Sequence, residues 1–519
     1  MYQELSVCIS THEKGNIDYS VIVDGLFMYK DNTSTKGSVE AFIKEYSNGK
    51  QDFNECYGVF RFSMTRKDTG EKLCFADNSG MMRYYIDQSR QKLFVSLAES
   101  KALNERKANY RAIAQFLAYG CVYDEETIIK SVFYSNPNCY YVLNENKITT
   151  HSKSLNSLFE YRECDITLHT LIEKATKHCE GRIGCTITGG IDSRSVLANL
   201  ISINTKPELT ITGHESQDDV IIARKIAKAT GLNLTIISDG IDENDWLDHS
   251  IEAADGQEGI CEIYRLNKQA RYLKQNKIEL QFGGVAGEMY KNSFINQDFP
   301  IYFGKPNWDK FYKYKVGTFD YNKSYFSDEM QEELKKLKDS ISEWLKKNKG
   351  CNKADTYNNA GYSIMQARCN HVINMFERYT TVYNPLMERK LAAYSFGKDP
   401  YKLENQAYQR QQVSQYCEKF KNIETDRGLT CNYNRRFIES IKSYLFLIKV
   451  ASQRLLYRKK IDIRIDECFT EGHKDGQFFR ALENTKNLGI LNQNISINEV
   501  PIGLADRLFT IGLFFSCEE

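Results

Sequence analysis

The sequence lacks an excess of either charge, since 69 Lys and Arg residues against 68 Asp and Glu residues leave a formal charge of +1 over 519 residues. A balance this even argues against a broad attraction to nucleic acid or to an anionic membrane surface. The sequence also lacks any apolar run of the roughly 20 residues that a membrane-spanning helix needs. Its first residues, Met-Tyr-Gln-Glu, have no apolar core like that of a secretion signal. We therefore expect a cytoplasmic protein with no membrane partner.

Paired cysteines are missing too. The chain has 15 cysteines, but no two of them form a Cys-x-x-Cys pair, and the eight histidines are scattered. Zinc-ribbon and dithiol redox sites therefore have little support. In a reducing cytoplasm we expect most of these thiols to be reduced and buried as small hydrophobic side chains.

The first part of the chain, up to about residue 160, consists of β-rich runs separated by tight turns. Runs such as 57–64 and 72–76 are rich in strand-forming residues, and Asp-Thr-Gly and Asn-Ser-Gly sequences follow them. One helical stretch, 110–119, precedes further strand-like runs at 139–143 and 147–150. This pattern predicts a mostly antiparallel sheet with few helices.

After about residue 165 strands and helices alternate. The predicted strands are 183–187, 208–213, 233–238 and 278–282, and the predicted helices between the first three of them are 194–203 and 219–230. Alternation at this spacing indicates βαβ units on a parallel sheet. Ligands of such sheets bind beyond the carboxyl ends of the strands, where the loops Thr188–Arg194 and Gly283–Glu288 are expected. From about residue 355 the chain is mainly helical.

The loop Thr188-Gly189-Gly190-Ile191-Asp192-Ser193-Arg194 has a composition suited to an anion. Gly189 and Gly190 let the backbone approach closely, and the amides that open the next helix favour negative charge. Asp192 would repel a phosphate unless a cation lay between them, which suggests Mg²⁺. The loop has no lysine at the spacing of a Walker loop, so transfer of a γ-phosphate is not implied.

This loop resembles the Ser-Gly-Gly-x-Asp-Ser loop of ATP pyrophosphatases, in particular those of the asparagine synthetase family. The similarity continues over nearly the whole chain in matching order. It includes Tyr57-Gly58-Val59-Phe60, Asp77-Asn78-Ser79-Gly80, the run from Phe94 to Leu103, the run from Ala114 to Gly120, the second glycine loop Gly283–Glu288, and the run from Tyr383 to Leu391.

The resemblance implies an α/β protein with three parts. Residues 1–160 would form a glutamine-amidotransferase-like domain with an Ntn-hydrolase-like αββα sandwich. Residues 161–440 would form an ATP-pyrophosphatase domain of the adenine-nucleotide α-hydrolase-like, Rossmann-like type. Residues 441–519 would form a helical extension.

The resemblance also implies an ATP-dependent carbon–nitrogen ligase. Such an enzyme adenylates a small-molecule or peptide carboxylate, releases pyrophosphate, and joins the carboxylate to an amine. The residues implied in binding ATP and pyrophosphate are Thr188, Gly189, Gly190, Asp192, Ser193, Arg194, Gly283 and Gly284. Arg194 either faces the phosphates as a cation or points away from them as a surface residue of the helix.

The chain departs from the family at its start. The glutaminase domain of these enzymes uses a cysteine that becomes the N-terminal residue, whereas this chain has Tyr2 at that position. We therefore expect no glutamine hydrolysis, and we expect Cys8 to be a buried strand residue. This loss is shared with β-lactam synthetases and lasso-peptide cyclases, which use an amine of the substrate.

Further departures concern the ATP site. The second magnesium aspartate of the family aligns with Gly287, which leaves Glu288 to act with Asp192 on Mg²⁺. Thr381 and Tyr383 stand where an acidic residue and an arginine are expected. The candidates for the cation that stabilises the transition state are Lys398, Lys402 and Lys449.

Two other hypotheses stay open. One is a nucleotide-binding scaffold or partner protein with weakened catalysis. The other is an enzyme of this loop type that modifies nucleic acid, for which the basic cluster Arg454, Arg458, Lys459 and Lys460 is the local support. The neutral overall charge disfavours the second.

Overall fold

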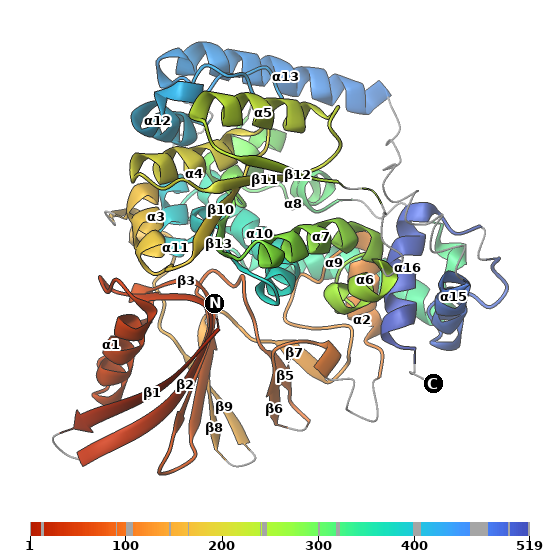
Figure 1. Ribbon diagram of the computed structural model, residues 1–519. Helices are drawn as coiled ribbons and strands as arrows, with labels where there is room; N and C mark the ends of the chain where they lie inside the picture. Colours follow the sequence, from red (N-terminus) through yellow and green to blue (C-terminus); the bar gives the residue numbers. More distant parts are fainter. Residues whose placement is uncertain are drawn as a thin grey trace.

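A computed structural model describes most of the chain. The described residues are 2–11, 15–89, 91–99, 107–144, 147–163, 166–238, 240, 246–298, 301–317, 322–397, 406–456, 476–496 and 499–516. Figure 1 shows antiparallel sheets in the lower half of the view and a parallel sheet with most of the helices in the upper half. This is the α/β class expected from the sequence.

The first part of the chain forms a six-stranded antiparallel sheet in the order β1-β2-β3-β4-β8-β9. Its strands are β1 (Tyr2–Thr11), β2 (Gly15–Tyr29), β3 (Cys56–Arg66), β4 (Lys72–Ala76), β8 (Cys139–Asn144) and β9 (Lys147–Ser152). Helix α1 (Thr35–Ser47) packs on one face, where Phe42 contacts Phe27 and Phe75 at ring-centroid distances of 5.9 and 5.1 Å. The alternation of apolar residues along β2 and β3 supplies this aromatic core.

A second, three-stranded antiparallel sheet has the order β6-β5-β7. Its strands are β5 (Tyr85–Asp87), β6 (Lys92–Phe94) and β7 (Val132–Tyr134). Strand β6 is shorter than the predicted run 92–97. Helix α2 (Tyr110–Tyr119) has the predicted bounds, because Asn109 caps its start and Gly120 ends it in a left-handed conformation at φ 78°.

The later part of the chain contains the predicted parallel sheet, in the order β12-β11-β10-β13-β14. Its strands are β10 (Arg182–Thr186), β11 (Glu208–Thr212), β12 (Leu234–Ile237), β13 (Ile278–Phe282) and β14 (Thr381–Tyr383), the last of which the sequence did not predict. From β10 the chain adds strands on one side, then returns to place β13 on the other side of β10. The topological switch point of the sheet therefore lies between β10 and β13.

Helices cover both faces of the parallel sheet and extend beyond it (Figure 1). They are α3 (Leu168–Lys177), α4 (Ile191–Ser202), α5 (Asp218–Thr230), α6 (Trp246–Ala254), α7 (Ile260–Gln275), α8 (Trp308–Phe311), α9 (Asp328–Lys346), α10 (Lys353–Glu377), α11 (Arg389–Ala392), α12 (Ala407–Tyr416), α13 (Arg436–Leu456), α15 (Gln477–Asn487) and α16 (Ile502–Phe514). None of the described helices combines the length and the apolar character needed to cross a bilayer.

The last helix returns to the first part of the chain. On α16, Arg507 donates to the Leu117 carbonyl at 2.7 Å, and Thr510 accepts from the Ile260 amide at 3.1 Å. The boundary expected at residues 440 and 441 falls inside the continuous helix α13.

Two polar contacts join the antiparallel part to the end of β14. The buried Glu388 carboxyl group accepts from the Gly58 amide at 2.6 Å, and Lys390 pairs with Glu55 at 2.5 Å. Gly58 adopts φ 107°, and a Cβ atom there would collide with the Leu26 carbonyl. Glycine at this position therefore lets β3 lie close to β2 while its amide donates to Glu388.

Candidate functional site

The two glycine loops lie together at the switch point of the parallel sheet. The loop that begins at Thr188 follows β10, and the loop Gly283–Val285 follows the neighbouring strand β13. Gly284 packs so closely on the start of α4 that a Cβ atom there would lie 2.6 Å from the Ser193 amide nitrogen. The predicted juxtaposition of these loops is confirmed, and the close approach explains the glycine at position 284.

The first loop is held by its own side chains. The Thr188 amide donates to the Ser193 hydroxyl at 3.1 Å, and the Gly190 amide donates to the Thr188 hydroxyl at 3.3 Å. The Gly189 amide donates to the Asp219 carboxylate at 2.8 Å. Asp219 lies in the first turn of α5, so this bond ties the loop to that helix. In this state three of the loop amides have partners within the chain.

Arg194 neither faces a phosphate nor points to the surface. Its side chain is fully buried and donates to the carbonyls of Ile423 at 2.6 Å, Glu424 at 2.9 Å and Gly189 at 3.0 Å. The guanidinium thus joins the first loop to the segment that follows α12. Both interpretations left open by the sequence are wrong. The guanidinium, with five N–H donors in one plane, binds three backbone carbonyls instead.

Asp192 lies at the first turn of α4 and is surrounded by the second loop. The Lys291 ammonium pairs with its Oδ2 at 2.6 Å, and the Gln409 amide nitrogen donates to its Oδ1 at 3.1 Å. Lys291 follows the short 3-10 helix η4 (Gly287–Tyr290), and a Cβ atom at Gly287 would collide with the Asp192 carboxylate. The Asp192 and Lys291 side chains are only 17% and 12% exposed, so water screens this pair weakly.

The predicted Mg²⁺ site does not fit this arrangement. Mg²⁺ takes oxygen ligands in near-octahedral geometry, whereas both oxygens of Asp192 already accept N–H groups. Glu288 is exposed, and its negative charge acts with burial to raise the pKa of the Cys369 thiol to about 12, with burial the larger cause. Within the described part of the chain, no three His, Cys, Asp or Glu side chains gather as a metal site.

Two buried amide side chains beside the loops have an atom without a partner. Asn384, which follows β14, accepts from the Val285 amide at 3.2 Å, yet its Nδ2 has no partner among the described residues. Gln409, fully buried on α12, donates from Nε2 to Asp192 and to the Gly287 carbonyl, and its Oε1 has none there either. Unsatisfied buried polar atoms are costly, so a ligand contact would explain both.

The remaining sequence candidates lie elsewhere. Lys398 and Lys402 are outside the described residues, and Lys449 is exposed on α13. Thr381 donates to Glu377 at 3.0 Å, and Tyr383 donates to Glu388 at 3.0 Å. Both side chains therefore form buried hydrogen bonds near β14 rather than hydrogen bonds to the glycine loops.

Tyr2 opens β1 opposite Asp24 of β2. Cys8 lies further along the same edge strand and is exposed, so the expectation of a buried cysteine is wrong. A hydrogen bond to Asp18 raises the pKa of the Cys8 thiol above its usual range. Among the other described cysteines only Cys351 is exposed, in line with the prediction that most are buried free thiols.

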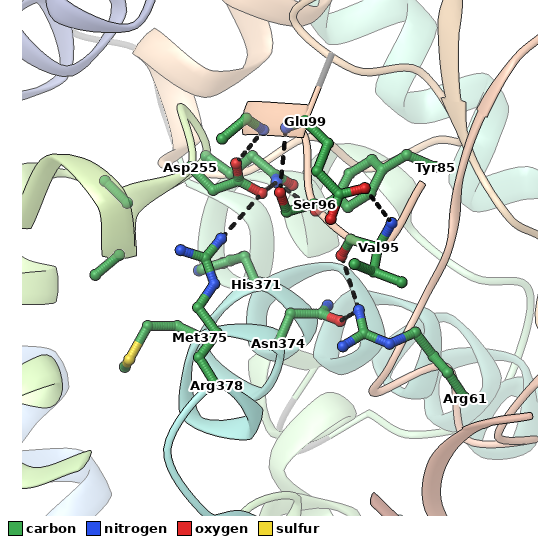
Figure 2. A pocket seen from close by; sticks show the side chains of 14 residues that line it. Arg61, Tyr85, Val95, Ser96, Glu99, Asp255, His371, Asn374, Met375 and Arg378 are labelled. Carbon is green, nitrogen blue, oxygen red and sulfur yellow. Dashed lines mark hydrogen bonds and ion pairs between the residues drawn. The ribbon is translucent and has the colours of Figure 1, made fainter. Parts of the chain in front are cut away.

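A cavity of about 350 Å³ lies between the antiparallel part of the chain and α10 (Figure 2). The charged groups that line it have partners within the chain: Arg61 pairs with Asp24 at 2.5 Å, and the Asp255 carboxylate accepts from the Leu97 and Ala98 amides at 2.8 and 2.6 Å. Arg378 approaches Asp255 at 3.8 Å. Because these groups are already bonded within the chain, we interpret the cavity as part of the junction between the two halves.

Neither the protein-family models nor the curated proteins show a match to this sequence.

Sequence reasoning missed the three side chains that complete the loop site: Lys291, Gln409 and Asn384. Lys291 stands three residues after Glu288, so its proximity to the second loop could have been noticed. Gln409 lies on α12, more than 100 residues from either loop, and only the fold reveals its role. Asn384 immediately precedes Pro385, in a segment considered only for its resemblance to the family.

Proposed function

We propose that this protein is an ATP-dependent carbon–nitrogen ligase of the asparagine synthetase type. It adenylates a small-molecule or peptide carboxylate and joins it to an amine. The main support is the meeting of two glycine loops at the switch point between β10 and β13, where α/β sheets bind their ligands. The loop Thr188–Arg194 opens helix α4, whose free amides and dipole favour a polyphosphate.

In the proposed reaction a carboxylate oxygen attacks the α-phosphorus of ATP. The bond between the α-phosphorus and the bridging oxygen breaks, and that oxygen leaves with its electron pair on pyrophosphate. An amine then attacks the acyl carbon, loses a proton, and displaces AMP. The chain contributes positioning through the loop amides and positive charge through Lys291, the cation beside Asp192.

The finer architecture belongs to the same proposal. The two antiparallel sheets with α1 and α2 would be an Ntn-hydrolase-like domain, and the five-stranded parallel sheet an adenine-nucleotide α-hydrolase-like domain. Tyr2 occupies the position of the family's nucleophile, and a phenol there does not provide a thiolate. We therefore propose that the first domain is structural and that glutamine is not hydrolysed.

The test is product analysis. The purified protein is incubated with ATP, Mg²⁺ and pools of candidate carboxylates and amines, and the nucleotides are separated by chromatography. Formation of AMP and pyrophosphate that depends on a carboxylate supports the proposal. Steady formation of ADP and phosphate would contradict it. Glutamine is included in a parallel reaction, where no release of glutamate is expected.

A nucleotide-binding scaffold is the second candidate, and one observation favours it. The Asp219 carboxylate accepts a hydrogen bond from the Gly189 amide, a donor that a bound phosphate would otherwise use. Binding of ATP without formation of AMP from any carboxylate would select this candidate. Nucleic-acid modification has less support, since the formal net charge of the chain is only +1. Arg458, Lys459 and Lys460 of the basic cluster lie outside the described residues.

A further inference from the structure

The loop site contains a positive charge of its own. The Lys291 ammonium lies 2.6 Å from the Asp192 carboxylate, at the point where the second loop meets the start of α4. Its backbone follows η4, which Ala286 precedes with an unusual left-handed φ of 70°. A non-glycine residue in that conformation is strained, and such strain is concentrated at functional sites. The loop thus holds Lys291 against Asp192 despite a cost in backbone energy.

The second loop has no space for another acidic side chain beside Asp192. Its carboxylate fills the space beside the Gly287 Cα atom, where any side chain would collide with it. Gln409 bonds to its other oxygen and to the Gly287 carbonyl. The Asp192 oxygen and the Gly287 carbonyl oxygen are both acceptors, so the amide nitrogen of Gln409 must face them and its Oε1 must face away. The network therefore fixes the orientation of Gln409 as well as the position of Asp192.

From these contacts we infer that Lys291 is the counter-cation of a polyphosphate site at the two glycine loops. The inference rests on the proposed function and adds that ATP or pyrophosphate binds there without a divalent cation. An ammonium has three N–H donors, so Lys291 can bond to a phosphate oxygen and keep its bond to Asp192. The cation is needed because Asp219 also lies at the loop and would repel a phosphate.

The unsatisfied atoms beside the loops support a ligand at this place. Gln409 Oε1 and Asn384 Nδ2 belong to buried side chains that contact the Asp192 cluster and the Gly283–Val285 loop, respectively. One is an acceptor and the other a donor, so both together suit a ligand that carries hydroxyl groups as well as phosphate oxygens. A nucleotide has both kinds of group, whereas pyrophosphate would engage only the donor.

The experiment measures binding of ATP and of pyrophosphate by calorimetry, in EDTA and in Mg²⁺. The unchanged protein should bind ATP in both buffers with affinities within about threefold of each other. Lys291→Gln should weaken binding in EDTA by about tenfold or more, as expected for the loss of one charge-assisted hydrogen bond. The matched control is Lys353→Gln, which removes a similarly buried lysine that pairs with Asp298 instead of with Asp192.

A second variant distinguishes a direct loss of binding from a loss caused by misfolding. Lys291→Gln leaves the Asp192 carboxylate with only one partner, whereas the double variant Asp192→Asn with Lys291→Gln leaves no lone charge. It should fold like the parent by circular dichroism and still lose binding in EDTA. The inference is overturned if the parent binds ATP only with Mg²⁺, or if both Lys291 variants bind like the parent in EDTA. A parent that binds neither ligand in either buffer would instead refute the proposed nucleotide site.

Discussion

Glu388 should make the stability of the protein fall as the pH rises from acidic to mildly alkaline values. Its carboxyl group is buried where β3 meets the end of β14, and it accepts from the Gly58 amide and from the Tyr383 hydroxyl. These two bonds favour the charged form, but burial outweighs them and raises the pKa of Glu388 to about 8. The folded protein therefore holds this group protonated at neutral pH.

The sign of the effect follows from linkage. In the unfolded chain the pKa of Glu388 is near the ordinary 4.5, so the folded state binds the proton more tightly. Its contribution to stability is complete below about pH 4.5 and is lost as the pH rises through about 8. A span of about 3.5 pH units, at about 1.4 kcal/mol for each, gives a loss of order 5 kcal/mol as an upper value. Relaxation around the charge would reduce it.

Thermal unfolding of the parent and of Glu388→Gln at pH 5.5 and pH 8.5 measures this effect. The glutamine is neutral at both values and keeps an acceptor oxygen for Gly58. We expect the parent to lose much more stability than the variant between the two values, so that the variant is relatively more stable at pH 8.5. Glu377, whose pKa burial raises to about 7, contributes equally to both proteins and cancels in the comparison. Equal losses in both proteins would refute the assigned charge state of Glu388.

Two further predictions concern the loops. Gly284→Ala should lower the free energy of unfolding by about 1–3 kcal/mol, because the new Cβ would lie 2.6 Å from the Ser193 amide. The control Gly190→Ala should cost less than 1 kcal/mol, since its Cβ would meet only the Thr188 hydroxyl, at 3.4 Å. Denaturant titrations measure both losses, and equal losses would contradict the close packing of the loops. Arg194→Met should cost about 2–4 kcal/mol, because the Ile423 and Glu424 carbonyls lose the guanidinium as donor and the Gly189 carbonyl keeps only the Asp426 amide. A variant that unfolds at the parent's temperature would show that these bonds are not needed.

The sequence predicted well those features that depend on local pattern. The bounds of β13 and α2 match the expected ranges because a short apolar run and a capped amphipathic stretch each define their own ends. The meeting of the glycine loops followed from one rule, that neighbouring parallel strands place their carboxyl ends at the same edge. These predictions required no knowledge of distant contacts.

The failures have a common physical cause, since they concern side chains whose partners are distant in sequence. Arg194 was expected at a phosphate or at the surface, but its partners Ile423 and Glu424 are more than 200 residues away. Cys8 was expected to be buried because it lies in a strand, yet a strand at the edge of a sheet exposes part of its length. Neither outcome can be obtained from the residues around these positions alone.

Gly287 and Lys291 act together on Asp192. Gly287 leaves space for the Asp192 carboxylate, and Lys291, four residues later, pairs with that carboxylate. An aspartate at 287 would collide with Asp192 as long as Lys291 and Gln409 hold that carboxylate in place. Gly287→Asp alone should therefore disrupt the loop, and it should be tolerated better when Lys291→Gln releases Asp192. Comparing the thermal stability of the single and double variants tests this coupling, since independent sites would give additive losses.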